Sequence, residues 1–480
     1  MSERPDDTPE GETLEMAPEA ASETPSDEQT EAEHDEVDAA VITALTAGDT
    51  EGLKELVEGL HYADVADVVE RLNEDDRSQF LTELGDDLPS EVWAELDDAV
   101  RETVFEDMEP AQIAAAVAEL DSDDAVEIVE EMEEPEQKAV LEAMAAPDRR
   151  LIEQSLGYPD DSAGRLMQRE IVTVPTNWTV GETIDYMRAA AEGDEDILPT
   201  SFYDIFVVDP THKPVGAIHL SHLLRSKRPI KVAEIMQTEL KLIPVTMDQE
   251  DVAFLFRQRD LVSAPVVDEA QRLVGAITID DVVDVIHEEH EEDMLALAGV
   301  GEADLYDAAI DTTKARFRWL LVNLFTAILA SLVIGLFETT LQQVVALAIL
   351  MPIVASMGGN AGTQTLTVAV RALATRELTS TNAYRVIGKE LLVGAINGVL
   401  FAVITGAIAW GWFQEPQIGL IIGMAMIVNM IVAGLAGASI PLLLDRAGVD
   451  PAIASSVFLT TVTDVVGFFA FLGLAAAFLL

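Results

Sequence analysis

The sequence predicts a multi-domain membrane protein: an all-α acidic superhelical N-domain, an α+β repeated pair, and an α-helical transmembrane domain of five spans. Three observations carry this prediction, namely an uneven distribution of charge, an internal repeat, and five long apolar segments near the C-terminus. Of the 87 Asp and Glu and 28 Lys and Arg residues, 80 and 23 precede Trp319. The 480-residue chain therefore joins two chemically different parts.

The formal net charge of −59 has two explanations. Excess carboxylates keep a halophilic surface hydrated in strong salt, which we favour for the overall excess. Alternatively, particular acidic clusters collect cations. The sequence contains no basic patch to meet phosphates, which argues against a nucleic-acid partner. It has no cysteine, which excludes disulfides and thiolate metal sites, and no signal peptide is visible before the first apolar stretch.

The N-terminal part divides by composition into a tail and a helical region. Residues 1–37 hold 14 acids, one base and almost no large apolar side chain, so we expect a disordered acidic tail. Residues 38–156 show apolar side chains at helical spacing, and three short units within 108–144 resemble one another. Stacked short helices in a superhelical N-domain explain this pattern.

A different repeat follows, in which each copy mixes alternating strand-like runs with a helix. Met167 matches Met236 at an offset of 69, and Gly216 matches Gly275 at an offset of 59. The first copy therefore carries about ten extra residues, around EGDEDILPTS. Each copy is predicted to be a βαββα unit. The two copies are assigned to 157–229 and 230–290.

Five segments are apolar enough to cross a hydrocarbon core about 30 Å thick, which needs about 20 helical residues. Lys and Arg concentrate before the first span and in alternate connections, so the positive-inside rule places the N-terminus and soluble region in the cytosol and the C-terminus outside. The protein is expected in the cytoplasmic membrane. The spans are 319–337, 341–370, 391–413, 417–444 and 453–480 of a transmembrane domain at 319–480, preceded by a connecting helix at 291–318.

Asp464 stands alone in an apolar run of the last span. A carboxylate at membrane depth is costly and usually faces water or a partner, although a protonated or helix-end Asp without a role is the alternative. Thr460, Thr461 and Thr463 add oxygens, the ligand type that hard cations prefer. In a two-fold dimer, two copies of Asp464 would line one pore.

The second span contains MPIVASMGGNAGTQTLT. Pro352 and three glycines favour a broken helix against a water-filled cavity, or else close helix packing through small residues. The sequence leaves both interpretations open.

The residues described above resemble those of a known protein family. The paired repeats resemble a tandem CBS module, and the whole order from 40 to 480 resembles the MgtE family of CBS-domain-containing Mg²⁺ transporters. The most specific segments are GGNAGTQ (358–364) and GVDPAIASSVFLTTVTDVVG (448–467). The resemblance implies a homodimer that transports Mg²⁺ without chemical catalysis, and no Walker or HExxH motif is present.

The resemblance also implies site residues. Asp464 would hold hydrated Mg²⁺ in the pore, and Asp450 would lie at its cytosolic mouth, although Asp450 precedes Pro451 and suits a helix N-cap equally. Glu127 stands where the family pattern has Asp. Regulatory Mg²⁺ would bind acidic faces that approach one another in the closed state. The implied sensor positions are Asp123, Glu127, Gly164, Asp248, Glu250, Asp260, Asp281, Asp284, Glu289, Glu292 and Asp293.

Some CBS pairs bind adenine nucleotides through a Thr and an Asp near the end of each copy. The second copy has Thr278 and Asp281, whereas the first has His219 and His222 at these places, so adenine nucleotide is expected only in the second. Two other functions stay open: transport of Co²⁺, Mn²⁺ or Ni²⁺, and a membrane-anchored CBS sensor that transports nothing.

Overall fold

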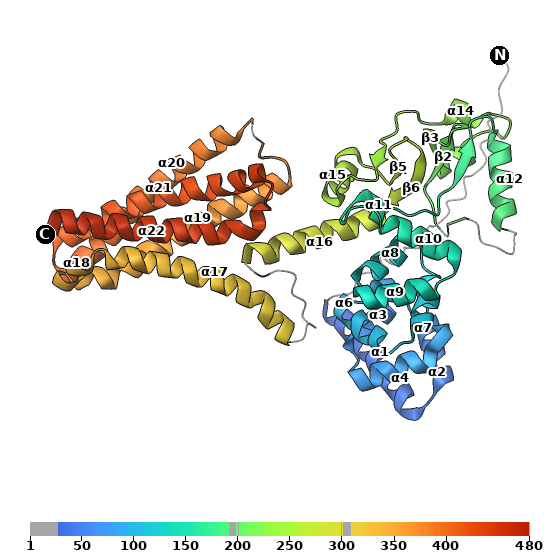
Figure 1. The fold of residues 1–480 in the computed structure, drawn as a ribbon, viewed down its shortest axis with the longest axis horizontal. Coiled ribbons are helices and arrows are strands. Elements are labelled where there is room, and N and C mark those ends of the chain that lie inside the picture. The colour runs from blue at the N-terminus through green and yellow to red at the C-terminus, as the bar shows by residue number, and fades with distance from the viewer. Residues whose placement is uncertain are drawn as a thin grey trace, which may run out of the picture. The chain divides into compact units, whose positions relative to one another are not determined.

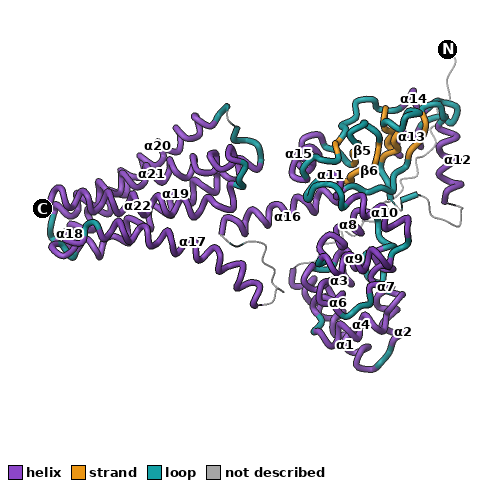
Figure 2. The backbone as a smooth tube through the Cα atoms, viewed as in Figure 1, coloured by secondary structure: helices purple, strands orange, loops and turns teal. Residues whose placement is uncertain are grey.

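The computed structural model describes residues 27–191, 198–199, 201–298, 300, 309–379 and 381–479. The chain forms two compact units that divide after Leu120, and each is described by itself. Figure 1 labels the elements along the chain, and Figure 2 distinguishes helices from strands. Among the described residues, the strands lie in the middle of the chain, with helices before and after them in sequence.

The first unit consists of short helices joined by polar turns. Asp49, Asn73 and Asp97 each accept a backbone hydrogen bond at a helix start, which explains the regular polar punctuation of the sequence. Buried Leu53 and Phe80 are part of its apolar core. The elements are α1 (Asp27–Ala47), α2 (Thr50–Glu58), α3 (Tyr62–Arg71), α4 (Glu74–Leu84), η1 (Gly85–Asp87), α5 (Val92–Glu95), α6 (Asp98–Glu106) and α7 (Pro110–Val117).

Helix α1 begins inside the predicted tail. Residues 1–26 lie outside the described residues, but 27–37 belong to α1. The helix is anchored further along by buried Val41 and by an ion pair in which Arg71 Nε lies 2.9 Å from Asp38 Oδ2. Acidic residues do not prevent helix formation where the following turns pack on a core.

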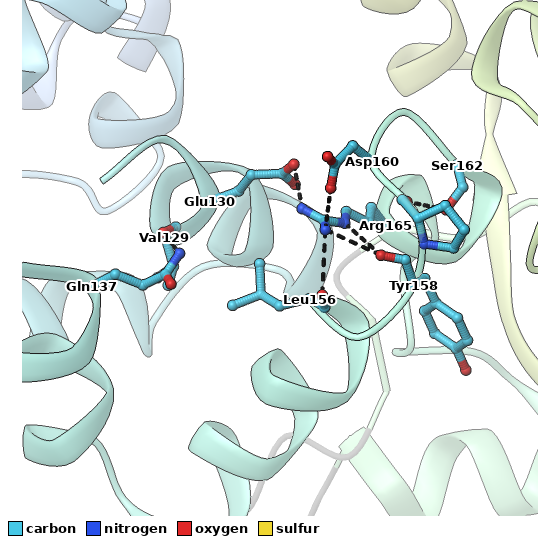
Figure 3. A network of polar contacts seen from close by, with 9 residues as sticks. Val129, Glu130, Gln137, Leu156, Tyr158, Asp160, Ser162 and Arg165 are labelled. Carbon is cyan, nitrogen blue, oxygen red and sulfur yellow. Dashed lines mark hydrogen bonds and ion pairs between the residues drawn. The ribbon is translucent and has the colours of Figure 1, made fainter. Parts of the chain in front are cut away.

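The second unit opens with α8 (Ser122–Glu131), α9 (Glu134–Ala143), α10 (Ala146–Ser155) and α11 (Ala163–Leu166). Figure 3 shows how Arg165 of α11 links them to the repeats. Its guanidinium pairs with Glu130 and Asp160, and Arg165 Nε donates to the Tyr158 carbonyl at 3.1 Å. This network fixes α8 beside the start of the first repeat.

Both repeats have the predicted βαββα order, which is confirmed. Each forms a three-stranded sheet whose first two strands are parallel and whose last two are antiparallel. The first contains β1 (Thr173–Pro175), α12 (Val180–Ala191), β2 (Asp204–Val208), β3 (Pro214–His219) and α13 (Leu220–Arg225). After α14 (Val232–Ile235), the second contains β4 (Ile243–Pro244), α15 (Gln249–Arg259), β5 (Ser263–Val267), β6 (Leu273–Thr278) and α16 (Ile279–Ala298).

The repeated Met and Gly residues hold the two copies together. A Cβ added to Gly216 would lie 2.5 Å from Met236 Sδ, and one added to Gly275 would lie 2.8 Å from Met167 Sδ. Each methionine therefore packs on the glycine of the other copy, where a larger residue has no room. This reciprocal contact explains why both residues recur in the sequence.

Among the described residues, five helices are long and apolar enough to cross a membrane, which confirms the five predicted spans. Helix α21 packs against α19, α20 and α22, whereas α17 contacts mainly α22. The helices are α17 (Ala309–Gly335), α18 (Glu338–Gln343), α19 (Ala346–Ala374), α20 (Ala383–Phe413), α21 (Pro416–Ala447) and α22 (Pro451–Leu479), and all but α18 are spans.

The Pro352 region of the second span is not broken, because α19 runs through it as one helix. A Cβ added to Gly358 would lie 2.1 Å from Asn429 Nδ2, and one added to Gly362 would lie 2.8 Å from Leu459 Cδ1. The glycines thus serve close packing against α21 and α22, which favours the small-residue interpretation.

The predicted connection at 291–318 differs from a single helix. Helix α16 continues from the second repeat to Ala298, and α17 begins at Ala309 and runs into the first span. Residues 299 and 301–308 lie outside the described residues.

Candidate metal sites

Asp464 lies on α22 and is half-buried. Within the described part of the chain, no hydrogen bond or ion pair satisfies its carboxylate. The neighbouring threonines are turned to their own helix: Thr461 Oγ1 donates to the Val457 carbonyl at 2.7 Å, and Thr463 is fully buried. Thr463 therefore adds no accessible oxygen, contrary to expectation, while Thr460 stays exposed.

Asp450 has the helix-capping role that the sequence allowed, and its role at the cytosolic mouth of the pore stays a prediction. Its Oδ1 accepts a hydrogen bond from the Ala452 amide at 2.7 Å, so it caps the start of α22. Its negative charge also contributes to raising the pKa values of Glu250 and Asp293, after the larger effect of burial. The cap therefore faces acidic residues of α15 and α16.

The predicted sensor residues Asp123 and Asp281 form an interacting pair between α8 and α16. Burial raises the pKa of Asp123 well above its ordinary value, and the charge of Asp281 raises it further. Burial likewise raises the pKa of Asp281 to about 6, against hydrogen bonds from Thr278 that lower it. The pKa of Asp284 is raised by burial and by the negative charge of Asp280. These carboxylates resist ionisation unless a positive charge joins them.

A second group lies where α15 and α16 meet α22. We call it the α15–α16 cluster, and it consists of Asp248, Glu250, Glu289, Glu292 and Asp293. Burial raises the pKa of Glu289 to about 7, and the charge of Glu250 adds to this, while a hydrogen bond from Gln249 Nε2 at 3.1 Å lowers it.

The remaining predicted sensor positions are not gathered in this way. Glu127 is exposed on α8. Asp260 ends α15 in a left-handed conformation with φ of 52°, at the opposite end of that helix from Asp248. Gly164 packs under Tyr158, whose ring would lie 2.5 Å from an added Cβ.

Among the residues that the structure describes, no three His, Asp or Glu side chains converge as ligands of one metal ion. The pair and the cluster bring carboxylates into electrostatic range but not into shared ligation. This arrangement suits hydrated cations or faces that close further on binding.

Two polar residues of the membrane domain, one buried and one partly buried, were missed by sequence reasoning. Asn429 is fully buried, and its Nδ2 donates to the Val354 carbonyl at 2.8 Å. Its Oδ1 accepts no hydrogen bond among the described residues. Glu390 was assigned to a connection because the apolar run starts at 391, but α20 extends back to Ala383. A lone polar residue within a long apolar segment was the available signal for Asn429.

Five helices long enough to cross a membrane, a carboxylate without a described partner in the last of them, and an acidic part with paired repeats define a class: cation-transporting membrane proteins. Comparison with known families agrees. Residues 351–474 match the family described as MgtE, divalent cation transporter, and the MgtE intracellular N domain matches 60–161. CBS domains match 163–228 and 232–288. The chain belongs to the MgtE family.

Individual relatives support this assignment. The chain is 37% identical to the magnesium transporter MgtE of Thermus thermophilus over 66% of this chain and 70% of that protein. It is 33% identical to that of Enterococcus faecalis over 67% and 70%. It is also similar to the crystal structure of the cytosolic domain of the Mg²⁺ channel MgtE in complex with ATP, at 31% identity, a TM-score of 0.48, and coverage of 52% of this chain and 99% of that chain.

Proposed function

We propose that this protein is a homodimeric, channel-like transporter that takes up Mg²⁺ across the cytoplasmic membrane. The observation that carries the proposal is Asp464, a half-buried carboxylate on a spanning helix with no protein partner among the described residues. Keeping a charged group at this depth costs free energy, so its natural counterpart is a cation. A mere membrane anchor has no use for such a group.

The ligand chemistry favours Mg²⁺ over softer metals. The chain contains no cysteine, and oxygen atoms are what Asp464 and nearby Thr460 supply. Mg²⁺ keeps much of its hydration shell and needs few direct protein ligands. Two copies of Asp464 across a two-fold axis would balance its charge of two. The relatives named as magnesium transporters support the same ion.

For orientation, we infer that the N-terminus and the repeats lie in the cytosol and the C-terminus outside. Arg371 lies in the last turn of α19 and Arg376 follows that helix, while Arg385 and Lys389 lie in the first turns of α20. The connection and its flanks are therefore rich in positive charge. The connections after α17 and after α20 carry only acidic charge. Positive connections remain on the cytosolic side.

We further infer that Mg²⁺ in the cytosol closes the transporter through the carboxylates. Without cations, the Asp123–Asp281 pair and the α15–α16 cluster repel; with cations, shared binding draws their faces together. The end of α16 can transmit this movement to the membrane domain, because Ala296 packs in one apolar cluster with residues of three spanning helices, namely Leu366, Ala436 and Leu459. Mg²⁺ that has entered the cytosol would then reduce further Mg²⁺ uptake.

Adenine nucleotide is a further ligand that we propose for the second repeat. Thr278 Oγ1 donates to Asp281 Oδ2 at 2.9 Å, so the two residues share one site. In the first repeat, His219 Nδ1 lies instead 2.6 Å from Asp204 Oδ1. Because Asp281 also faces Asp123, nucleotide and Mg²⁺ binding are expected to influence each other.

The test is ion flux into proteoliposomes that contain the purified full chain and a trapped Mg²⁺-sensitive dye. We expect Mg²⁺ entry that exceeds entry into protein-free vesicles and that survives an excess of Na⁺. Insertion is verified by protease accessibility. Correctly inserted protein without flux would identify an anchored sensor instead, and faster entry of Co²⁺, Mn²⁺ or Ni²⁺ than of Mg²⁺ would reassign the transported metal.

A further inference from the structure

A cavity of about 110 Å³ lies within the membrane domain, apart from Asp464. Its walls come from α19, α20 and α21, whereas Asp464 belongs to α22. The cavity has room for an ion and water, since a single water needs only about 10–15 Å³ of such space. The lining residues that matter are Gln364, Thr365, Glu390, Gly394, Asn397 and Gly434.

Two glycines hold Glu390 at the cavity wall. A Cβ added to Gly434 would lie 2.7 Å from the Glu390 carbonyl oxygen, and one added to Gly394 would lie 2.6 Å from the Met430 carbonyl oxygen. The backbones of α20 and α21 therefore touch at this level, and a larger residue would force them apart. The position of the Glu390 backbone is thus fixed by helix packing.

The Glu390 carboxylate is poorly compensated by protein. Its side chain is 13% exposed, and it accepts a hydrogen bond from Thr365 Oγ1 at 3.2 Å. The nearest cation is Lys389 Nζ at 3.5 Å, but that side chain is 72% exposed, so solvent screens the pair. A partly buried carboxylate with one neutral hydrogen bond and a solvent-screened ion pair is stabilised by a further positive charge beside it.

The other polar residues of the cavity also lack protein partners. Gln364 is exposed and Asn397 is half-buried, both line the cavity, and neither side-chain amide makes a hydrogen bond to a described residue. Together with Thr365 and Glu390 they present one carboxylate, one hydroxyl and two amide oxygens around one space. Oxygen ligands of these kinds are typical of hard-cation sites.

We propose that this cavity binds a monovalent alkali cation, Na⁺ or K⁺, with Glu390 as its charge partner. One carboxylate balances one positive charge, whereas Mg²⁺ would leave an excess charge in a region of low dielectric constant. A proton on Glu390 would neutralise the carboxylate but would leave the amide oxygens of Gln364 and Asn397 without a cation to bind in the cavity. An alkali ion engages the carboxylate and the amide oxygens together, with water filling the remaining space.

The test is equilibrium binding of radioactive ²²Na⁺ to the full chain in nanodiscs, with K⁺ and Mg²⁺ as competitors. We expect saturable binding of about one ion per chain, and at least a tenfold loss of affinity in Glu390→Gln, which keeps the shape of the side chain. The matched control is Glu415→Gln, an exposed carboxylate at the start of α21, which should bind as the parent does. Because binding is measured rather than transport, the result does not depend on the Mg²⁺ flux proposal.

Asn397→Ala is a second variant in case Glu390→Gln is not monodisperse, and we expect it to weaken Na⁺ binding several-fold. Equal Na⁺ affinity in the parent and in the folded variants would overturn the proposal. So would the absence of saturable Na⁺ and K⁺ binding, which leaves a protonated Glu390 beside water. Displacement of Na⁺ by Mg²⁺ at lower concentration than by K⁺ would make the site divalent and would equally reject it.

Discussion

Carboxylates occur in two contrasting settings in this protein. In the membrane domain they are few and separate, since Asp464 is the sole charged residue of α22 after its first turn. In the repeats and α16 they crowd together, so that Glu250 is influenced by Asp248, Asp293 and Asp450 at once. An isolated carboxylate binds a cation by itself. Clustered carboxylates repel one another and can bind one cation together.

The difference teaches where single substitutions should matter. No neighbouring carboxylate can replace Asp464, so we expect its neutralisation to abolish Mg²⁺ transport. In the α15–α16 cluster, four acids remain when one is neutralised, and the electrostatic field at a bound cation changes only in part. We therefore expect function in the membrane domain to depend on single residues, and the proposed regulation to depend on the acidic residues together.

The largest effect is expected for Asp464→Asn, which removes the charge and keeps the size. We predict that Mg²⁺ flux into proteoliposomes falls at least a hundredfold, since a charge-assisted contact in a low-dielectric pore is worth about 3 kcal/mol or more. The matched control is Asp445→Asn, an exposed residue near the end of α21 that should keep parental flux. An inserted Asp464→Asn protein that conducts normally would remove this residue from the pore.

Next comes collective neutralisation of the sensor. Replacing Asp248, Glu250, Asp281, Asp284, Glu289 and Asp293 with Asn or Gln should leave a conducting pore that no longer responds to Mg²⁺ on the sensor side. The amides bind Mg²⁺ weakly, so the ion loses its preference for the closed state and cannot shift the equilibrium. We expect the Mg²⁺ concentration for half-closure to rise at least tenfold.

Protease accessibility of residues 287–318 across a Mg²⁺ series checks this independently of flux. In the parent, protection should rise with Mg²⁺; in the sixfold variant it should stay flat. Equal protection in both proteins would mean that these carboxylates only hydrate the surface and that the sensor lies elsewhere.

A smaller effect is expected from pH. The pKa values of Asp281 and Glu289 are raised to about 6 and about 7 by burial, above the value of about 4 that Asp and Glu have in an unfolded chain. The folded protein thus holds extra protons between about pH 4 and 7, and metal-free stability falls as pH rises through this window.

Protons and Mg²⁺ compete for the same carboxylates. Lowering the pH from 8 to 6 should weaken Mg²⁺ binding by roughly tenfold, measured by calorimetry on the full chain. Asp281→Asn with Glu289→Gln should flatten this dependence. An unchanged slope in the double variant would assign the pH effect to other groups.

The smallest effect is predicted for Asp260→Asn. This residue is exposed at the far end of α15 from Asp248, so its charge is screened from the α15–α16 cluster. We expect less than a twofold change in the Mg²⁺ concentration for half-closure. Glu289→Gln is the comparison, with a several-fold change expected. A larger effect of Asp260 than of Glu289 would reverse the proposed division between clustered and isolated sensor acids.

Several parts of the fold were predictable because local sequence determines them. The five apolar segments each have enough length to span a membrane, and the offsets that relate Met167 to Met236 define the repeats before any contact is known. The apolar run around Asp464 also placed this residue on the last span, and the resemblance implied its role. The sequence could not show that Met167 and Met236 pack across the two copies, each against a glycine of the other copy.

The misjudged positions share a physical cause, namely packing between distant segments. Pro352 suggested a broken helix, but the glycines around it serve contacts with Asn429 and Leu459, which are remote in sequence. Glu390 was treated as part of a charged connection because hydropathy ends a span at its first charge. Only the meeting of α19, α20 and α21 shows that this residue borders a cavity.

Helix α16 has a mechanical consequence. Its 20 residues make a rod about 30 Å long, with Asp281 near one end and Ala296 near the other. A rod of this kind converts a small rotation at the carboxylate end into a displacement of ångströms at the far end, without any part of it unfolding. The response time is then set by the collective motion of whole domains, in microseconds to milliseconds, rather than by slower refolding.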